Sequence, residues 1–380
     1  MLRLRPEATA ALIEAILRGD GCEAEESRIV ADHLVEASLS GHDSHGVIRI
    51  VRYHRWLRDG TLAPRRRLRE IARGGAFVQF DGENGLGQAL ARAATEAGIE
   101  LARREGVGVV ALRRAGHLGR AGAYAEQANA CGLVSVHFVT VAGSRLVAPF
   151  GSAERRASTA PVAVGVPHPE RREDDFVLDF STARVAEGKA LVAAQGGKAL
   201  PPDALMAPDG APTGDPAVLY GDTLDHSAPD PRAGPGALRA MGEHKGSGLM
   251  LACELLAGAL TGAGTNAVGG RSFGNGMLSV LIDPARFDDL GGFGAEVAGF
   301  VDSIRGARPA RGVARVMIPG DPERAARAER REAGLPLGPA AFEAMLAAAA
   351  EAGAKASPEA LVLAQEPGAA PAARTMPLQP

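Results

Sequence analysis

Cysteine is scarce in this sequence, and its three cysteines form no recognisable motif. Cys22, Cys131 and Cys253 lie far apart among 380 residues, and no CxxC pair occurs. This usage is typical of a reduced cytosolic protein and gives no signature of a metal site. The expected location of the protein is therefore the cytoplasm.

The sequence also lacks the features of membrane and nucleic-acid-binding proteins. Residues 1–6 contain no uninterrupted apolar core of the kind that defines a signal peptide. No apolar run reaches the roughly 20 residues that a membrane helix needs, and the best candidate, 248–264, carries Glu254. The formal net charge of −3 argues against a dedicated nucleic-acid binder, which usually has a strongly basic domain. We therefore expect neither a membrane nor a nucleic acid as a partner.

The motifs by which nucleotide-binding and catalytic sites are most readily identified are missing as well. The glycines of 82–87 have the wrong spacing for GxGxxG, and neither Lys189 nor Lys198 completes a GxxxxGK[ST] loop. No GxSxG elbow or HExxH pair occurs, and no cysteine lies in an obvious activating context. A zinc site within 42–45 is an alternative without a supporting ligand pattern. We expect no metal.

What is present is an ordinary globular composition, with 46% apolar and 23% charged residues. The length allows one large domain or two ordinary ones. Apolar spacing predicts helices at 6–18 and 24–40, followed by a third helix that begins after Ser44 and ends near Gly60. The N-terminal region is therefore expected to be helical.

From about residue 75, strand-like runs alternate with alanine-rich helical runs, which predicts an α/β core. The predicted strands are 77–81, 107–112, 133–139, 162–166, 176–180, 277–282 and 313–318. The predicted helices are 86–105, 124–131, 247–260, 293–305, 322–333 and 339–352. The Pro-, Gly- and Asp-rich stretch 198–236 is predicted to be a long loop or flap.

The densest concentration of chemistry is the stretch 41–49, GHDSHGVIR. Ser44 is a good N-cap for the pattern that follows it. At about 100° per residue, one helix face collects His45, Arg49, Arg52, Tyr53 and Trp56. Such a face would present an acid/base group one turn from a cation, which suits a small anionic substrate that gains or loses a proton. The alternative is a solvated face that happens to carry a histidine.

Two further stretches place polar groups at predicted strand ends. In 116–124, three glycines after a strand let backbone N–H groups approach an anionic ligand, with His117 close to it. The alternative is an ordinary tight turn between a strand and a helix. In 179–183, Asp179 ends an apolar strand, where an acid can orient a histidine. Alternatively, Asp179 or Ser181 caps the next helix.

Two other stretches lie at predicted helix starts. In 242–248, Lys245 opposes the helix macrodipole, a cost that a bound phosphate or carboxylate would offset. The alternative is a flexible loop with an exposed lysine. The stretch 318–324 is predicted to form a strand, a turn and a helix with acids in its first turn. Its residues alone indicate an ordinary connection between two elements.

These stretches resemble the malate/L-lactate dehydrogenase type 2 family, NAD(P)-dependent oxidoreductases unrelated in fold to the Rossmann lactate and malate dehydrogenases. The similar segments are SHG-x-x-R-x-x-x-Y from Ser44, GHLGRAGAYAEQA from Gly116, VAPFGS from Val147, DFSTARVAEGK from Asp179 and EHKGSGLMLACELLAGALTG from Glu243. Matching runs extend in family order from about residue 7 to 350. The His-Leu-Gly-Arg version of the second motif is most similar to the hydroxycarboxylate dehydrogenase branch.

The resemblance implies an α/β fold in which a non-Rossmann, mixed-sheet nucleotide-binding domain accompanies a helical domain formed by both chain ends. We expect the helical domain at 1–70 and 295–365, and the α/β cofactor- and substrate-binding domain at 71–294. A disordered tail is expected at 366–380. The resemblance also implies a homodimer with cofactor and substrate near the subunit interface.

Site residues carry over by motif position. His45 matches the acid/base histidine of the family, Ser44 its neighbour and Asp179 the acid that orients it. Arg49 matches the residue that holds the substrate carboxylate, for which a guanidinium offers a bidentate fit. His117 lies where some relatives have a second functional histidine. Further substrate-binding candidates are Tyr53 and Arg120. The candidates for the dinucleotide site are His45, His117, Gly119, Arg120, Ala121, Asp179, Phe180, Ser181, Thr182, Ala183, His244, Lys245, Asn275, Gly320, Asp321, Pro322 and Glu323.

The predicted activity is reversible hydride transfer between NAD(P), with NAD as the first choice, and a 2-hydroxy acid/2-oxo acid pair. His45 would take the hydroxyl proton in oxidation and return it in reduction. Arg120 stands where many relatives have a small residue, which favours a dicarboxylate substrate or a reshaped cofactor site. Two alternatives are a reductase of cyclic imines of the piperideine-2-carboxylate type and a non-catalytic ligand-binding homologue. The intact His45, Arg49, Asp179 and Lys245 argue against the second.

Overall fold

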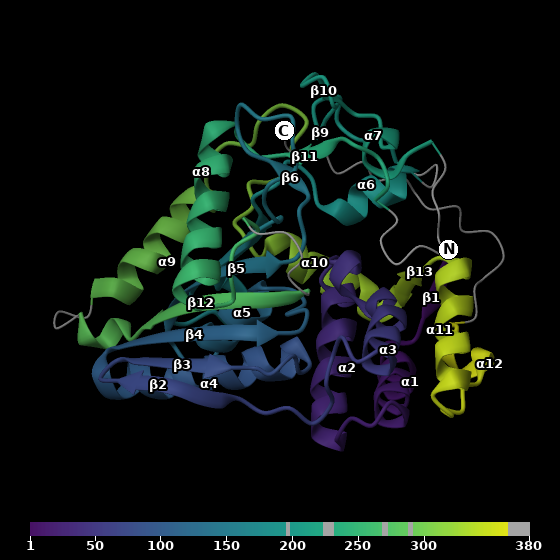
Figure 1. Cartoon of the computed structure of the whole chain (residues 1–380). Helices are drawn as coiled ribbons and strands as arrows, with labels where there is room; N and C mark the ends of the chain where they lie inside the picture. The colour runs from purple at the N-terminus through teal and green to yellow at the C-terminus, as the bar shows by residue number, and fades with distance from the viewer. Residues whose placement is uncertain (195–197, 223–231, 268–272, 288–291, 364–380) are drawn as a thin grey trace. The chain divides into compact units, whose positions relative to one another are not determined.

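The structure, a computed structural model, describes residues 1–194, 198–222, 232–267, 273–287 and 292–363. Within these residues the chain forms two compact units (Figure 1). The first comprises 1–58, 167–176 and the part beyond 287, and the second comprises 59–166 and 177–287. The segment 167–176 leaves the second unit and folds with the first, which no sequence pattern indicated. The tail expected at 366–380 lies outside the described residues.

The first unit is built mainly of helices from both chain ends. Its helices are α1 (Pro6–Gly19), α2 (Ala24–Leu39), α3 (Ile50–Arg58), α9 (Gly292–Arg305), α10 (Asp321–Ala333), α11 (Pro339–Glu351) and α12 (Pro358–Leu361), with a short 3-10 helix at Arg172–Asp174. A two-stranded antiparallel sheet joins β1 (Leu2–Leu4) to β13 (Leu335–Leu337). The predicted helices 6–18 and 24–40 are confirmed. Proline at N1 starts α1, and Leu12, Ile13, Ile16 and Leu17 form its buried stripe.

The second unit is organised around a seven-stranded sheet in the order β2-β3-β4-β12-β5-β7-β8. Its strands are β2 (Arg69–Gly74), β3 (Phe77–Asp81), β4 (Val107–Ala115), β12 (Gly274–Ile282), β5 (Val134–Ala142), β7 (Pro161–Val166) and β8 (Phe176–Ser181). The β3–β4 pair is parallel, whereas β2–β3, β4–β12, β12–β5 and β5–β7 are antiparallel. Because a Rossmann sheet is mostly parallel, this mixed sheet agrees with the predicted non-Rossmann α/β class.

Helices cover both faces of this sheet (Figure 1). On one face lie α4 (Gly87–Glu105) and α5 (Gly122–Asn129), and on the other lie α8 (His244–Cys253) and the π-helical segment Glu254–Leu260. Alternation along β12 shows the two sides. Leu281 faces α4, because its side chain lies 2.6 Å from the position that a Cβ on Gly98 of α4 would take. Gly276 faces the π-helical segment, because a Cβ there would lie 2.1 Å from the carbonyl oxygen of Ala257.

A smaller, four-stranded sheet accounts for part of the predicted long loop. Its strands are β6 (Val147–Ala148), β9 (Leu205–Met206), β10 (Pro212–Thr213) and β11 (Ala237–Arg239), accompanied by α6 (Glu187–Ala194) and α7 (Ala217–Tyr220). The prediction of a long loop over 198–236 therefore agrees with most of the described residues of that stretch and is wrong at β9, β10 and α7, which interrupt it. Long-range contacts, which leave no periodicity in the sequence, hold this stretch in place. The guanidinium of Arg155 donates to the carbonyls of Leu219 (3.3 Å), Arg232 (3.3 Å), Gly234 and Gly236.

The predicted strand at 313–318 is also wrong. This run bends at Ala314 and Arg315 and finds no partner strand among the described residues, and Val313 and Met317 are exposed. The N–H of Ile318 instead donates to Oδ2 of Asp321 (3.0 Å), which begins α10. Hydrophobicity indicated a strand, but a strand forms only where a neighbouring edge accepts its hydrogen bonds.

Candidate functional site

The stretch 41–49 does not begin a long helix. It forms two 3-10 turns, Asp43–His45 and Val47–Arg49, before α3 starts at Ile50. The prediction that Ser44 caps a helix is therefore wrong. Gly46 causes the break, because its extended backbone (φ −92°, ψ −153°) separates the turns and a Cβ there would lie 2.0 Å from Ser38 Oγ.

The predicted helix face is only partly correct. Tyr53 is 1% exposed and belongs to the core of the first unit, so it does not share an open face with Arg52. Its ring stacks on Trp56 with centroids 6.0 Å apart, and the Arg52 guanidinium lies 5.7 Å from the Trp56 centroid. The substrate-binding role of Tyr53 stays a prediction.

His45 and Arg49 are half-buried on the two consecutive turns. Nε of Arg49 donates to the carbonyl of Ser44 at 2.5 Å, so this guanidinium is tied to the turn that carries the histidine. The His45 N–H donates to the carbonyl of His42 (2.8 Å), which closes that turn. An acid/base group and a cation therefore share one locally ordered segment.

His42 and Asp43, which the sequence left without a role beyond an unsupported zinc alternative, attach this segment to α10. Nε2 of His42 lies 3.2 Å from Oε1 of Glu323. Arg330 donates to both carboxylate oxygens of Asp43, at 2.6 and 3.0 Å, and also to the carbonyl of Ser38. The pairing of Glu323 with His42 links the predicted dinucleotide-binding turn 320–323 to the SHG motif. Nothing local in the sequence signals contacts between residues almost 300 positions apart.

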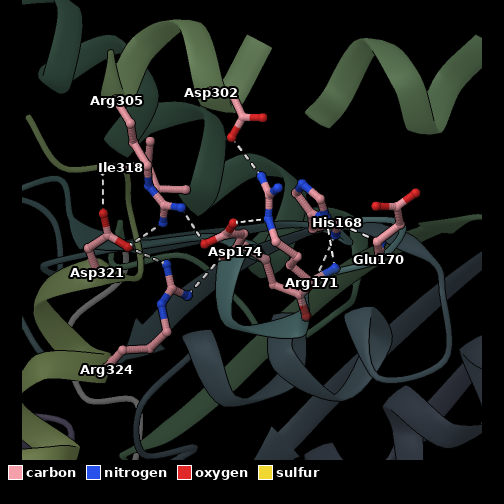
Figure 2. A network of polar contacts seen from close by, with 10 residues as sticks. His168, Glu170, Arg171, Asp174, Asp302, Arg305, Ile318, Asp321 and Arg324 are labelled. Carbon is pink, nitrogen blue, oxygen red and sulfur yellow. Dashed lines mark hydrogen bonds and ion pairs between the residues drawn. The ribbon is translucent and has the colours of Figure 1, made fainter. Parts of the chain in front are cut away.

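The 320–323 turn is held by an ion network within the first unit (Figure 2). Gly320 adopts a left-handed conformation (φ 101°), which favours glycine, and α10 starts at the next residue. Asp321 accepts hydrogen bonds from Arg305 (2.8 Å) and Arg324 (2.7 Å). Burial alone would raise the pKa of Asp321, but these donors and the Ile318 N–H hold it below its usual value. The carboxylate therefore stays charged and fixes the turn.

A pocket of about 390 Å³ borders the same turn. Its lining consists of Glu173, Asp174, Arg305, Arg315, Val316, Asp321, Arg324 and Ala325. Asp174 pairs with Arg305 and with Arg171, which reaches on to Asp302 at 2.6 Å (Figure 2). The predicted cofactor turn thus faces a polar pocket whose lining includes three arginines and three carboxylates.

In the second unit, the stretch 116–124 comprises the loop 116–121, which connects β4 to α5, and the first turn of α5. Gly119 is left-handed (φ 76°) and His117 is half-buried. The Leu118 N–H donates to Oδ1 of Asn275 (3.2 Å), and Nδ2 of Asn275 donates to the Thr140 carbonyl (2.8 Å). Asn275, a predicted cofactor residue, therefore supports this loop from β12.

Asp179 contacts the other end of the same loop. Its Oδ2 accepts a hydrogen bond of 2.7 Å from the N–H of Gly122, the first residue of α5. The alternative of helix capping thus applies to the preceding α5 instead of the next helix. Arg120 is 2% exposed and pairs with Glu126, and Ala121 beside it is buried as well. The position of the Asp179 carboxylate at the N-terminus of α5 is favourable, because its negative charge interacts with the positive end of the helix dipole.

The strand end after Asp179 is held by one carbonyl. Thr159 O accepts hydrogen bonds from Ser181 Oγ, Thr182 Oγ1 and Thr182 N, each at 3.0 Å. Ser181 Oγ in turn accepts from the N–H of Ala183 (3.1 Å). Phe180 packs against the apolar cluster of the smaller sheet. The predicted cofactor stretch 179–183 is therefore a strand end fixed by several hydrogen bonds.

The start of α8 carries the predicted lysine. Lys245 is exposed in the first helical turn. The His244 ring contacts the edge of Phe150 at a centroid distance of 5.9 Å, and Ser247 Oγ accepts from the Phe150 N–H at 3.0 Å. The VAPFGS segment, which starts at Val147, therefore packs against the first turn of α8. Two motifs that are far apart in the sequence are thus neighbours in the structure.

Comparison with known proteins assigns the chain to a family. A family model of malate/L-lactate dehydrogenases matches residues 4–346. The chain belongs to the malate/L-lactate dehydrogenase family. This confirms the resemblance that the motifs indicated, and it covers both units of the structure.

Individual members of the family are similar over nearly their whole length. Hydroxycarboxylate dehydrogenase B of Escherichia coli O157:H7 is 36% identical over 358 residues, which cover 92% of this chain and 94% of that protein. L-lactate dehydrogenase of Cupriavidus necator is 36% identical over 323 residues, or 84% and 89% of the two chains. The structure of sulfolactate dehydrogenase from Methanocaldococcus jannaschii superposes with a TM-score of 0.81 at 31% identity, covering 93% and 98%. The family is thus one of dehydrogenases with the same fold.

Three further observations concern this member of the malate/L-lactate dehydrogenase family. Among the described residues, no group of three or more His, Cys, Asp or Glu side chains is placed to hold a metal ion. Burial raises the pKa of Cys253 to about 12, so this thiol is not an activated nucleophile. None of the described helices is both long and apolar enough to span a membrane.

Proposed function

We propose that the protein is an NAD(P)-dependent 2-hydroxycarboxylate dehydrogenase that interconverts a 2-hydroxy acid and its 2-oxo acid. The observation that carries this proposal is the SHG segment, where His45 and Arg49 lie on consecutive turns and Arg49 is hydrogen-bonded to Ser44. The names of the relatives, hydroxycarboxylate and L-lactate dehydrogenase, support the substrate class.

In the proposed reaction, Arg49 binds the substrate carboxylate through its guanidinium fork, which orients C2. Neutral His45 accepts the hydroxyl proton during oxidation, and protonated His45 returns it to the developing alkoxide during reduction. Bound NAD(P) supplies the chemistry of accepting or donating the hydride at C2. The assignment of Asp179 as the acid that orients His45 stays a prediction from the resemblance.

Several residues of the second unit fit a dinucleotide. Lys245 places a cation in the first turn of α8, which the helix dipole disfavours unless an anion such as a phosphate lies nearby. Gly119 is left-handed, as loops that approach a ligand with their backbone often require. We propose that Lys245, Gly119 and the 179–183 strand end bind the dinucleotide, with NAD as the first choice.

The proposal is tested with purified protein, both reduced dinucleotides and a panel of 2-oxo acids. The panel includes mono- and dicarboxylates and the cyclic imine piperideine-2-carboxylate. We expect cofactor oxidation with at least one 2-oxo acid. Faster turnover of the imine than of every 2-oxo acid would favour the reductase alternative, and cofactor binding without any turnover would favour the non-catalytic homologue.

Substitutions at the SHG segment test the assigned roles. His45→Ala should lower turnover by about 10²–10⁴ because a general acid/base is lost. Arg49→Lys should raise KM for the acid because a lysine cannot form the bidentate pair. Turnover of His45→Ala close to that of the wild type, with an unchanged melting temperature, contradicts the first role, and an unchanged KM in Arg49→Lys contradicts the second.

A further inference from the structure

Glu254 is a buried carboxylate in an otherwise apolar helical stretch. It is 6% exposed and begins the π-helical segment Glu254–Leu260. Its Oε1 accepts from Ser158 N (3.1 Å), Ser158 Oγ (2.9 Å) and Asn266 Nδ2 (2.9 Å), and its Oε2 accepts from Asn266 N (3.1 Å). Because a buried carboxylate is costly unless donors surround it, four donors arranged around Glu254 indicate a specific requirement for this acid.

One branch of the contacts leads from Glu254 to the strand end after Asp179. Glu254 holds both the N–H and the hydroxyl of Ser158, and the next residue is Thr159. The carbonyl of Thr159 binds Ser181 and Thr182 through three hydrogen bonds of 3.0 Å. The position of the 181–183 backbone therefore depends on the segment that Glu254 anchors.

A second branch leads to the 116–124 loop. Besides Glu254, Asn266 Nδ2 also donates to the Val141 carbonyl at 3.0 Å, and the Val141 N–H donates to Ser158 Oγ at 3.3 Å. The adjacent carbonyl, that of Thr140, accepts from Asn275, whose Oδ1 receives the Leu118 N–H. All of these residues belong to the second unit. Glu254 therefore stands at the junction of two polar chains that end at candidate cofactor segments.

We propose that Glu254 is a positioning residue for the dinucleotide site. It fixes the 181–183 strand end and the loop around Leu118 in the arrangement that cofactor binding needs, and it acts only through Ser158, Asn266 and their partners. The π-helical winding that starts at this residue is consistent with the role, because π segments are frequent at functional sites. The inference rests on the proposed dinucleotide dependence.

Glu254→Gln tests the role with minimal change of shape. All four contacts of Glu254 are donors, so a glutamine amide group faces a donor whichever way it turns. We expect the Kd of the full-length protein for NADH or NADPH, measured by fluorescence titration, to rise about tenfold or more. At saturating cofactor, KM for the 2-oxo acid should change by less than about twofold, a split that general destabilisation would not produce.

A second variant and a matched control keep the test decisive. Ser158→Ala removes the hydroxyl that donates to Glu254 and accepts from the Val141 N–H, while it keeps the Ser158 N–H, and should raise the Kd about threefold even if Glu254→Gln does not fold. Ile99→Ala, on α4 at the opposite face of the sheet, should lower the melting temperature and leave the Kd within about twofold.

The outcomes separate the two proposals. A wild-type protein that binds neither dinucleotide contradicts the proposed function. If the wild type binds, the positioning role is overturned by a Ser158→Ala variant that binds as tightly, by a folded Glu254→Gln variant that binds as tightly, or by an Ile99→Ala variant that weakens binding equally.

Discussion

At the scale of single residues, Gly46 determines how the SHG segment is shaped. Its backbone conformation (φ −92°, ψ −153°) is open to any residue, so the requirement for glycine is steric. The absent Cβ leaves room for Ser38, whose hydroxyl accepts the N–H of Val47 (3.1 Å). The prediction of a helix that begins after Ser44 is wrong for the same reason. Contact with α2, and not local helix propensity, separates the two 3-10 turns.

Gly46→Ala should therefore perturb the site beside it. The added Cβ would lie 2.0 Å from Ser38 Oγ, and relief of such overpacking costs about 1–3 kcal/mol. We expect a lower melting temperature and lower turnover, since His45 is the preceding residue. Gly299→Ala is the matched control, because nothing lies within 4 Å of a Cβ at this position in α9. Alanine there should leave turnover unchanged and raise stability by up to about 1 kcal/mol, and equal effects of the two variants contradict the steric argument.

At the scale of helices and strands, contacts between elements that are distant in the sequence position the residues of the candidate site more than the elements alone do. The pairing of the Asp43–His45 turn with α10 shows this, because Asp43 and Arg330 form a bidentate pair two residues from His45. The pair is partly exposed, and such ion pairs contribute only about 0–1 kcal/mol to stability. Its value would therefore lie in placing the turn that carries His45.

Asp43→Asn and Arg330→Met should lower kcat severalfold with little change in melting temperature. The double variant should be no worse than Arg330→Met alone, because Arg330→Met already removes the contact that Asp43→Asn removes, together with the one to the Ser38 carbonyl. Steady-state kinetics and thermal unfolding measure the two effects. Arg28→Met with Asp32→Asn, an exposed pair on α2 (3.0 Å), is the control and should leave kcat unchanged. Additive losses in the double variant contradict a shared role.

The central strands of the sheet contain a titratable group that makes stability depend on pH. His137 on β5 is fully buried, contacts Ser279 Oγ through Nδ1 (2.8 Å), and burial lowers its pKa to about 4. In the unfolded chain histidine takes up a proton below about pH 6.5. Between these values the unfolded state binds more protons, so stability falls as the pH drops from about 6.5 towards 4.

His137→Asn should flatten this pH dependence. The histidine accounts for a loss of up to about 3 kcal/mol over that window, calculated from the difference between the two pKa values. Urea unfolding at several pH values between 4 and 7 measures it, and the variant should show a shallower slope although it is less stable at pH 7. His244→Asn, an exposed histidine, should retain the wild-type slope. An identical slope in His137→Asn contradicts the assignment.

At the scale of the whole molecule, an apolar row remains exposed in the second unit. Leu251 and Leu255 lie one turn apart on α8 and the π-helical segment, and Leu260 ends it, with exposures of 49%, 61% and 65%. Contiguous exposed apolar surface marks interaction sites, and most soluble oligomers are symmetric dimers. We propose that a second copy of the chain covers this row, in line with the homodimer expected from the resemblance.

Leu255→Arg should weaken the dimer because a two-fold interface would bring two introduced charges together. Light scattering after gel filtration should show a dimer for the wild type and a larger monomer fraction for the variant. Ile71→Arg, an exposed apolar position on β2, is the control and should leave the mass unchanged. A monomeric wild type, or a Leu255→Arg variant that stays fully dimeric, contradicts the proposed interface.

The sequence by itself determined the family, the α/β class, most helices and every strand of the seven-stranded sheet except β2. These features depend on local order along the chain. Apolar periodicity predicted α1 and α2, a continuous apolar run predicted β4, and the motifs at Ser44, Gly116 and Asp179 carried the resemblance. Tertiary structure alone decided what each polar residue contacts. Asp43 with Arg330, Asp179 with Gly122, and Glu254 with Ser158 are pairs whose members lie far apart in the chain. No local pattern encodes such pairs, because they form only when packing of the apolar faces brings distant segments within hydrogen-bonding distance.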